Sequence, residues 1–286
     1  MKKLCTELFI AFQRLVPQHI LSRGGSILAE TKTVWLKNFL IKLFIKVYKI
    51  NLNEAISDSP DSYENFNAFF TRALKKEVRP IDIRASSIIC PVDGVVSQVG
   101  SIHEGDILQA KGKYFSTSAL LGSDDGYTKS FLSGEFITIY LSPKDYHRVH
   151  MPIDGKLVLA RYIPGKLFSV NLQTSNHIDG LFAKNERLVC IFDTPVGLCA
   201  VILVGAMMVA GIESVWRGQY CPQVPLIDNM DSKNFSLKKG EEMGRFKFGS
   251  TVIVMFEHRK TSWLEKYKPG LVTRYGELMT THAQRQ

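Results

Sequence analysis

The segment Met243-Gly-Arg-Phe-Lys-Phe-Gly-Ser-Thr-Val-Ile-Val254 runs into a series of β-branched and apolar residues that continues to Phe256. Such a series is typical of a strand, so we predict a strand over residues 251–256. Gly249 and Ser250 stand directly before it. On the simplest interpretation, these two residues form the turn that leads the chain into the strand.

The Gly249-Ser250 pair also permits a chemical reaction. Glycine leaves its carbonyl unshielded and its backbone free to adopt a strained conformation, so the next hydroxyl can attack that carbonyl and shift the acyl group from nitrogen to oxygen. β-Elimination of the ester then splits the chain and leaves residue 250 as a dehydroalanine. Its hydrolysis, with loss of ammonia, gives a pyruvoyl group whose ketone can form a Schiff base with an amine. The tripeptide alone does not distinguish this reaction from a simple turn.

Further β-rich runs surround this segment. They lie at residues 88–99, 136–141, 156–163, 187–192 and 199–209. Residues 194–212 carry no charge over a length close to that of a membrane span. Because Pro195, Gly197, Gly205 and Gly211 interrupt them, we predict two buried strands there. We therefore predict an α+β fold, in which N-terminal amphipathic helices precede a mainly antiparallel, β-rich domain of sandwich or flattened-barrel type.

The first 50 residues carry most of the net charge of +9, with seven Lys and two Arg against two acids. Apolar residues recur there at helical spacing in two stretches, and lysines flank the second stretch. The apolar residues are Leu4, Leu8, Phe12 and Leu15, then Trp35, Leu36, Phe39, Leu40, Leu43, Phe44 and Val47. Helices of this kind lie in a membrane interface, where each Lys or Arg near an anionic leaflet contributes about 1 kcal/mol.

The sequence of these helices permits other interpretations. They can form a hairpin that packs its apolar faces on the following domain. Nucleic-acid binding is disfavoured, because the lysines alternate with large aliphatic residues rather than with stacking aromatic ones. The lysines also break both stretches too often for a bilayer span, and residues 1–15 lack the continuous apolar core of a cleavable signal peptide.

Length and composition fit one main domain with an N-terminal attachment. A chain of 286 residues, 45% hydrophobic and 22% charged, can bury a sizeable core. The polar run within residues 51–64 marks the predicted boundary, which gives a helical region 1–60 and a catalytic domain 61–286. The five cysteines are odd in number and widely spaced, which indicates a reducing compartment.

An acid and two histidines accompany Ser250 as candidate site residues. Asp93 follows an apolar run and precedes Gly94, so it is either a turn residue or a carboxylate that orients an imidazole. His147 and His150 stand three apart after a Ser-Pro-Lys-Asp sequence, which predicts a short helix with both rings on one face. No third ligand stands at metal-binding spacing, so no metal is predicted.

As a group, these segments resemble the phosphatidylserine decarboxylases, a pyruvoyl-dependent proenzyme family of membrane lipid synthesis. The order and spacing agree over roughly residues 60–256. The matching segments are residues 66–74, 78–82, 91–95, 109–113, 145–152, 163–171, 185–187, 204–206 and 246–251.

The resemblance implies a role for each candidate. Ser250 is the self-cleavage nucleophile and the pyruvoyl precursor, and Asp93 and His150 complete the processing triad. His147 is the acid/base group in decarboxylation, where a pKa near neutrality suits a proton donor. Ser169 is a weaker candidate for substrate contact, with a buried, backbone-bonded serine as the alternative.

The resemblance further implies self-cleavage between Gly249 and Ser250 into a β chain (1–249) and an α chain (250–286). The expected reaction converts phosphatidylserine to phosphatidylethanolamine and CO2, with no external cofactor. The expected partners are an anionic membrane surface, the cleaved chains themselves and a second copy of the processed enzyme, at the cytoplasmic face of the cell membrane. Two alternatives stay open: a pyruvoyl enzyme for a soluble amino acid, and an uncut, non-enzymatic membrane-associated binding or scaffold protein.

Overall fold

The computed structural model describes residues 2–207, 211–220, 224–229, 234–247, 250–258 and 260–281. Gly249, one of the two predicted cleavage-site residues, lies outside the described residues. Ser250 is described.

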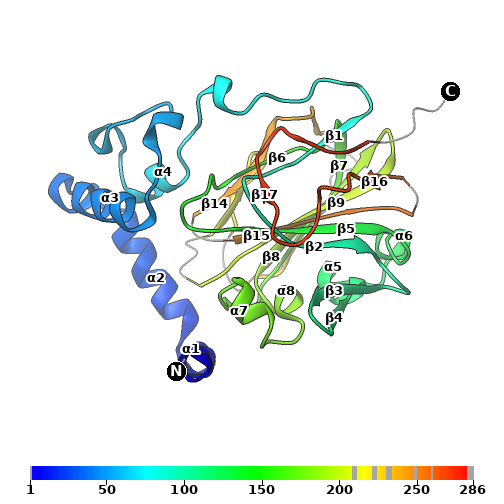
Figure 1. Ribbon diagram of the computed structural model, residues 1–286, viewed down its shortest axis with the longest axis horizontal. Helices are drawn as coiled ribbons and strands as arrows, with labels where there is room; N and C mark the ends of the chain where they lie inside the picture. The colour runs from blue at the N-terminus through cyan, green and yellow to red at the C-terminus, as the bar shows by residue number, and fades with distance from the viewer. Residues whose placement is uncertain are drawn as a thin grey trace.

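An antiparallel nine-stranded sheet forms the centre of the molecule (Figure 1). In spatial order its strands are β12 (Leu226–Asn229), β7 (Gly155–Ile163), β8 (Arg187–Thr194), β9 (Gly197–Val204), β15 (Ser250–Phe256), β5 (Glu135–Leu141), β2 (Gly94–Ser101) and β17 (Val272–Thr273), while β13 (Ser236–Leu237) also pairs with β7. The predicted runs become strands of this sheet, except that residues 88–99 are divided between β1 (Ser87–Ile89) and β2.

The strand β15 lies in the middle of this sheet, between β9 and β5. All of its residues are buried. Val252 and Val254 enter the core on one face of the sheet, whereas Ile253 and Met255 enter the core on the other. Because both faces are covered, β15 is continuously apolar from Val252 to Phe256 instead of alternating with polar residues.

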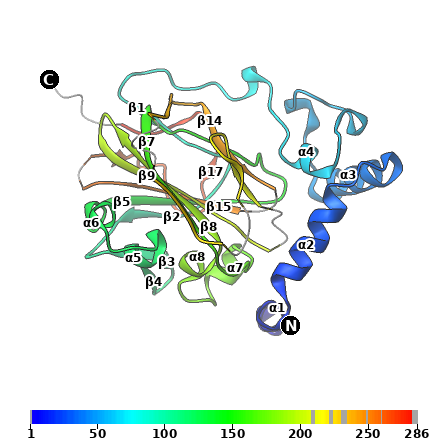
Figure 2. The ribbon, with the colours of Figure 1, turned by 180° about the vertical axis from the view of Figure 1, so that it is seen from behind.

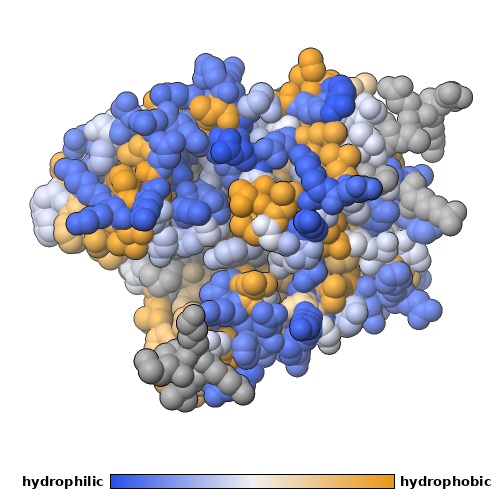
Figure 3. All heavy atoms as spheres, viewed as in Figure 1, coloured by the Kyte–Doolittle hydropathy of each residue, from blue (hydrophilic) through white to orange (hydrophobic). Residues whose placement is uncertain are grey.

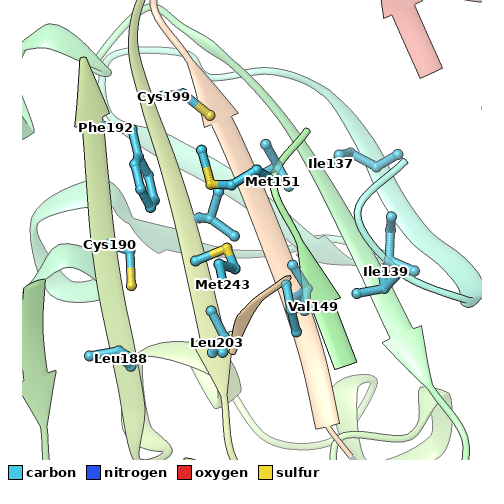
Figure 4. Close-up of a cluster of buried hydrophobic side chains, with 14 of the residues drawn as sticks. Ile137, Ile139, Val149, Met151, Leu188, Cys190, Phe192, Cys199, Leu203 and Met243 are labelled. Atoms are coloured by element: carbon cyan, nitrogen blue, oxygen red, sulfur yellow. The ribbon is translucent and has the colours of Figure 1, made fainter. Parts of the chain in front are cut away.

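Smaller layers cover the two faces. One face packs on a sheet of β11 (Gly218–Gln219), β10 (Ile212–Ser214), β14 (Glu242–Phe246) and β6 (Arg148–His150), and on a sheet of β1, β18 (Leu278–Thr281) and β16 (Ser262–Trp263). Figure 4 shows part of this core, where Val149, Met151 and Met243 meet Cys190 and Leu203 of the central sheet. The described strands form no closed barrel, so the sandwich form of the predicted α+β class is the one observed.

The other face carries short elements. They are β3 (Asp106–Ala110), β4 (Lys113–Ser116), α5 (Thr117–Leu121), α6 (Gly126–Ser130), α7 (Leu172–Ser175) and α8 (Leu181–Lys184). Apolar side chains of β3, β4, α5, α6 and α8 pack with the second side of β15, β8 and β9.

The N-terminal region lies beside the sandwich in both ribbon views (Figures 1 and 2). It comprises α1 (Lys2–Leu15), α2 (Gln18–Ala29), α3 (Val34–Tyr48), η1 (Leu52–Glu54), η2 (Pro60–Ser62), α4 (Phe66–Phe70) and η3 (Lys76–Val78). The two predicted helical stretches form α1 and α3. A third helix, α2, forms between them and continues through Gly24 and Gly25. A glycine costs a helix only about 1 kcal/mol, and the buried Ser22 and Ala29 fix this helix by tertiary contacts.

Two glutamines attach this region to the sandwich. The Gln13 Oε1 accepts a hydrogen bond from the Ser169 amide (2.7 Å), and the Gln18 Oε1 accepts one from the Leu167 amide (2.7 Å). The helices α3 and α4 form a small apolar core of their own, which includes Ile41 and Phe70. The N-terminal region is therefore partly packed and, on its outer side, partly exposed.

Two local predictions need correction. The predicted helix at residues 142–150 is wrong: the Asp145 carboxylate binds the Ser142 amide and hydroxyl (both 2.7 Å), but this cap opens only a turn, and the chain then enters β6. A strand forms here instead of a helix, because β6 pairs with β14, a segment far along the chain. Of the two strands expected in residues 194–212, one is β9; the second begins only at Ile212, and residues 208–210 lie outside the described residues.

Candidate active site

Ser250 is the first residue of β15, and its side chain is completely buried. It lies opposite Leu141 of β5, and the next residue, Thr251, lies opposite Val204 of β9. The Ser250 hydroxyl has no hydrogen-bond partner among the described residues. Since a buried hydroxyl without a partner is costly, it is a feature that needs a functional explanation.

His147 lies at the same end of these strands. Its Nε2 donates to the carbonyl of Ser142, the residue after Leu141 (3.1 Å). Because a carbonyl only accepts, Nε2 carries the proton and the Nδ1 lone pair is left over. Nδ1 is buried and makes no hydrogen bond to the described residues. The ring stacks on Phe70 of α4 with centroids 4.1 Å apart.

His150 is held by a different set of contacts. Its Nδ1 donates to the Gly240 carbonyl (2.8 Å), so its Nε2 accepts from the Tyr146 hydroxyl (2.9 Å). Its ring stacks on Tyr275 with centroids 3.7 Å apart. The two histidines thus lie in separate environments, as an extended chain requires, and not on one helix face.

Asp93 lies in the loop between β1 and β2. Its Oδ1 accepts from the Tyr275 amide (2.8 Å), and the Arg79 guanidinium binds both carboxylate oxygens at 2.5–3.1 Å. Gly94 follows because a Cβ there would lie 2.5 Å from the Tyr140 carbonyl oxygen. The Tyr275 amide and the Arg79 guanidinium therefore hold the Asp93 carboxylate in one orientation.

Asp93 and His150 both contact Tyr275, through its amide and its ring respectively. The His150 amide also binds the carbonyl of Pro91, two residues before Asp93 (3.0 Å). Within the part of the chain that the structure describes, no hydrogen bond joins His150 to Asp93 or to Ser250. The processing triad therefore stays a prediction. Sequence reasoning missed Tyr275 and did not single out Arg79, although residues 78–82 had been matched as a motif.

Ser169 belongs to a loop that Asn185 connects to the Ser250 end of the sheet. The Asn185 amide nitrogen donates to the carbonyls of Phe168 (2.8 Å) and Gly205 (2.9 Å). Gly205 follows Val204, the partner of Thr251, so four motifs that are distant in the sequence meet here. Ser169 itself is half-buried, and α1 covers its amide.

Comparison with known proteins agrees with this arrangement. The family model for phosphatidylserine decarboxylase matches residues 66–281, from α4 to the last strand, and a second model, described as PSD, matches residues 8–49. The chain belongs to the phosphatidylserine decarboxylase family. The match continues beyond residue 256, where the resemblance in the sequence had ended, and so includes Tyr275.

Relatives in this family match over nearly their full lengths. A phosphatidylserine decarboxylase proenzyme of Pseudomonas putida (strain W619) is 49% identical over 284 residues, which cover 98% of this chain and 99% of the relative. That of Hahella chejuensis is 50% identical (96% and 93% covered), and that of Alcanivorax borkumensis is 51% identical (92% of each).

The described residues contain no group of three or more His, Cys, Asp or Glu side chains placed to hold a metal ion. The described cysteines Cys90, Cys190 and Cys199 are buried thiols without disulfides. No helix in the described ranges is both long and apolar enough to cross a bilayer.

Burial sets the charge of both histidines in this decarboxylase-family site. It lowers the pKa of His147 to about 3, with a further lowering by the positive charge of Arg72, and it lowers the pKa of His150 to about 4. The expectation of a pKa near neutrality is therefore wrong for the uncut chain. Both rings are neutral at pH 7, which is the form that a general base requires.

These pKa values predict how stability depends on pH. Because the folded-state pKa values lie below the unfolded value of 6.5, the unfolded chain binds more protons, and the stability present above pH 6.5 is lost as the pH falls toward 4. We expect a loss on the order of a few kcal/mol from His147 alone. Urea unfolding of the Ser250→Ala chain between about pH 4 and pH 7 measures this loss of stability.

A second substitution isolates the effect. His147→Gln should flatten this pH dependence, whereas His177→Gln, at an exposed ring, should leave it unchanged. An equally steep curve for His147→Gln would contradict the assignment, because His150 and the carboxylates would then account for the whole effect.

Proposed function

We propose that this chain is a self-processing decarboxylase that converts phosphatidylserine to phosphatidylethanolamine and CO2, with a pyruvoyl group made from its own Ser250. The main support is the Ser250 hydroxyl at the head of the central strand. It is fully buried and has no hydrogen-bond partner among the described residues. The relatives' names add support, since each is called a proenzyme.

In processing, the Ser250 hydroxyl attacks the carbonyl of Gly249, and the ester that forms is split by elimination. His150 removes the serine proton in its neutral form, and the nearby negative charge of Asp93 stabilises the imidazolium. The Nδ1–H bond of His150 to Gly240 leaves Nε2 as the basic nitrogen, which must exchange Tyr146 for Ser250 before it can act.

In decarboxylation, the pyruvoyl ketone supplies the electron sink for the electrons released as CO2 leaves. The residues around it orient the carboxylate, exclude water and move a proton. His147 suits the last task, because its buried Nδ1 makes no hydrogen bond to described residues and Phe70 holds its ring in place. Ser169 is proposed as a weaker substrate contact, since its loop is tied to the Ser250 end of the sheet through Asn185.

The N-terminal region is proposed to hold the protein peripherally on the anionic, cytoplasmic face of the cell membrane. The outer side of α1 exposes Leu8, Phe12 and Leu15, and the outer side of α3 exposes Trp35 and Phe39. Figure 3 shows apolar side chains among hydrophilic ones over this region. Lys42, Lys46 and Lys49 are exposed beside them, whereas Lys37, another lysine of this stretch, is buried and binds the Pro60 carbonyl.

A basic cavity of about 660 Å³ lies where α1 and α2 meet the loop of Ser169. Arg14, Lys166 and Lys184 line it with His19, and the acid Asp179 also contributes to the lining. Its charge fits the phosphate-bearing surface on which the enzyme would work.

The remaining proposals concern organisation. The helical region comprises residues 1–60 and the catalytic domain residues 61–286. Cleavage within the catalytic domain divides the whole protein into chains 1–249 and 250–286. The two chains stay associated because β15 keeps its ladders with β5 and β9 after the cut. A homodimer of the processed protein is proposed from the family resemblance alone.

Product analysis tests the proposed reaction. Purified protein is incubated with vesicles that contain carboxyl-labelled phosphatidylserine, and in parallel with labelled free serine. We expect labelled CO2 and phosphatidylethanolamine from the vesicles and no CO2 from serine. CO2 from serine, unaffected by deletion of residues 1–50, would favour the soluble-substrate alternative.

A further inference from the structure

Arg79 is a buried cation whose guanidinium is fully engaged beside the predicted catalytic acid. Its Nε and Nη2 bind the Asp93 carboxylate, its Nη1 donates to the Val78 carbonyl (2.8 Å), and its Nη2 also donates to Glu54 (2.7 Å). The Arg79 and Asp93 side chains are only 8% and 10% exposed. A rigid guanidinium fork in this setting fixes the orientation of a carboxylate as a lysine cannot.

Glu54 reaches this pair from the N-terminal region. It ends η1, shortly after α3, and its backbone carbonyl accepts from the Lys75 amide (2.9 Å). A bridge between Ala55 and Leu74 holds the two segments side by side. The segment that carries Glu54 is thus attached directly to the one that leads to Arg79.

The charges explain why two carboxylates share one guanidinium. Arg79 alone would neutralise Asp93 and weaken its effect on His150. With Glu54 added, the three groups keep a net charge of −1, and Asp93, which is the member of the group that acts electrostatically on His150, is itself poorly solvated. The Tyr275 amide holds the remaining side of Asp93 (2.8 Å).

We propose that Arg79 and Glu54 are positioning residues for Asp93 in self-cleavage, so that the N-terminal region contributes part of the processing centre. The inference rests on the proposed role of Asp93 in processing. It goes beyond that role by assigning two residues to it, one of which lies outside the catalytic domain.

The rate of self-cleavage in the full-length chain tests the proposal. The intact precursor is followed by gel and mass after cell-free synthesis in the presence of vesicles. We expect Arg79→Lys to slow cleavage about 10- to 100-fold, the equivalent of losing a charge-assisted hydrogen bond. Glu54→Gln should slow it about 3- to 10-fold, because Glu54 is partly solvated. The matched control Glu64→Gln removes only an exposed ion pair with Lys32 and should cleave at the wild-type rate.

Two readouts separate positioning from general structural damage. Glu54→Gln should add nothing in an Arg79→Gln background, because both act through one guanidinium. Chains that have completed cleavage should decarboxylate phosphatidylserine with kcat and KM within about twofold of wild type, since positioning of Asp93 serves the earlier reaction. Unfolding midpoints are compared in the uncleavable Ser250→Ala background.

The outcomes are distinct. Wild-type cleavage rates in the Arg79 and Glu54 variants, with Asp93→Asn uncut, would overturn this inference and leave the proposed function standing. Wild-type cleavage by Asp93→Asn would instead remove the role of Asp93 on which the inference depends. Equal losses in cleavage, decarboxylation and unfolding midpoint would show that Arg79 only stabilises the fold, which also overturns it.

Discussion

Ser250→Ala is expected to abolish self-cleavage completely. Alanine has no hydroxyl to attack the preceding carbonyl, and no neighbouring side chain can replace it in that position of the backbone. The intact mass of the purified variant should equal that of residues 1–286, whereas wild type should give two chains, 1–249 and 250–286. The smaller chain should resist N-terminal sequencing, because a pyruvoyl group has no amine.

Thr138→Val is the matched control for this experiment. Thr138 is another fully buried hydroxyl without a partner among the described residues, and it lies on β5 opposite Ile253, away from the cleavage site. The variant should cleave as wild type does. An uncut chain in wild type and Ser250→Ala alike, after expression with membranes, would contradict the decarboxylase proposal and favour a non-enzymatic membrane protein.

The sequence predicted the fold class and the main strands because those features are local. β5, β7, β8 and β15 are long apolar runs, and burial on both faces of the sheet makes such runs easy to recognise. The short strand β6 was mistaken for a helix, because its Ser-Pro-Lys-Asp beginning is a true local cap signal. Only pairing with β14 decides its form, and no local pattern contains that information.

In the candidate site, too, local motifs predicted some features, while others depend on contacts between distant segments. Motifs drew attention to Ser250, Asp93, His147 and His150, whose roles stay predictions. The protonation of the two histidines depends on burial, which the motifs do not reveal, and so the expected pKa near neutrality was wrong. The contacts of Tyr275 with both Asp93 and His150 join segments that are far apart in the chain and that only the folded structure brings together.

His147→Gln is expected to separate the two reactions. The variant should cleave itself, because processing is assigned to His150, but its decarboxylation of phosphatidylserine should fall about 100- to 10,000-fold, the usual contribution of a positioned acid/base group. The physical reason is the Nδ1 lone pair of His147, which the Ser142 carbonyl fixes by holding the proton on Nε2. Quantifying both chain cleavage and CO2 release from one preparation measures the two effects independently.

The corresponding change at His150 completes the argument. His150→Gln should block cleavage, since the glutamine side chain is not basic enough to take the serine proton, and the control His177→Gln should affect neither reaction. The opposite pattern, an uncut His147→Gln beside a cleaved but inactive His150→Gln, would exchange the two roles. That exchange is physically meaningful, because in the uncut chain His147 has the unengaged lone pair while the basic nitrogen of His150 is occupied by Tyr146.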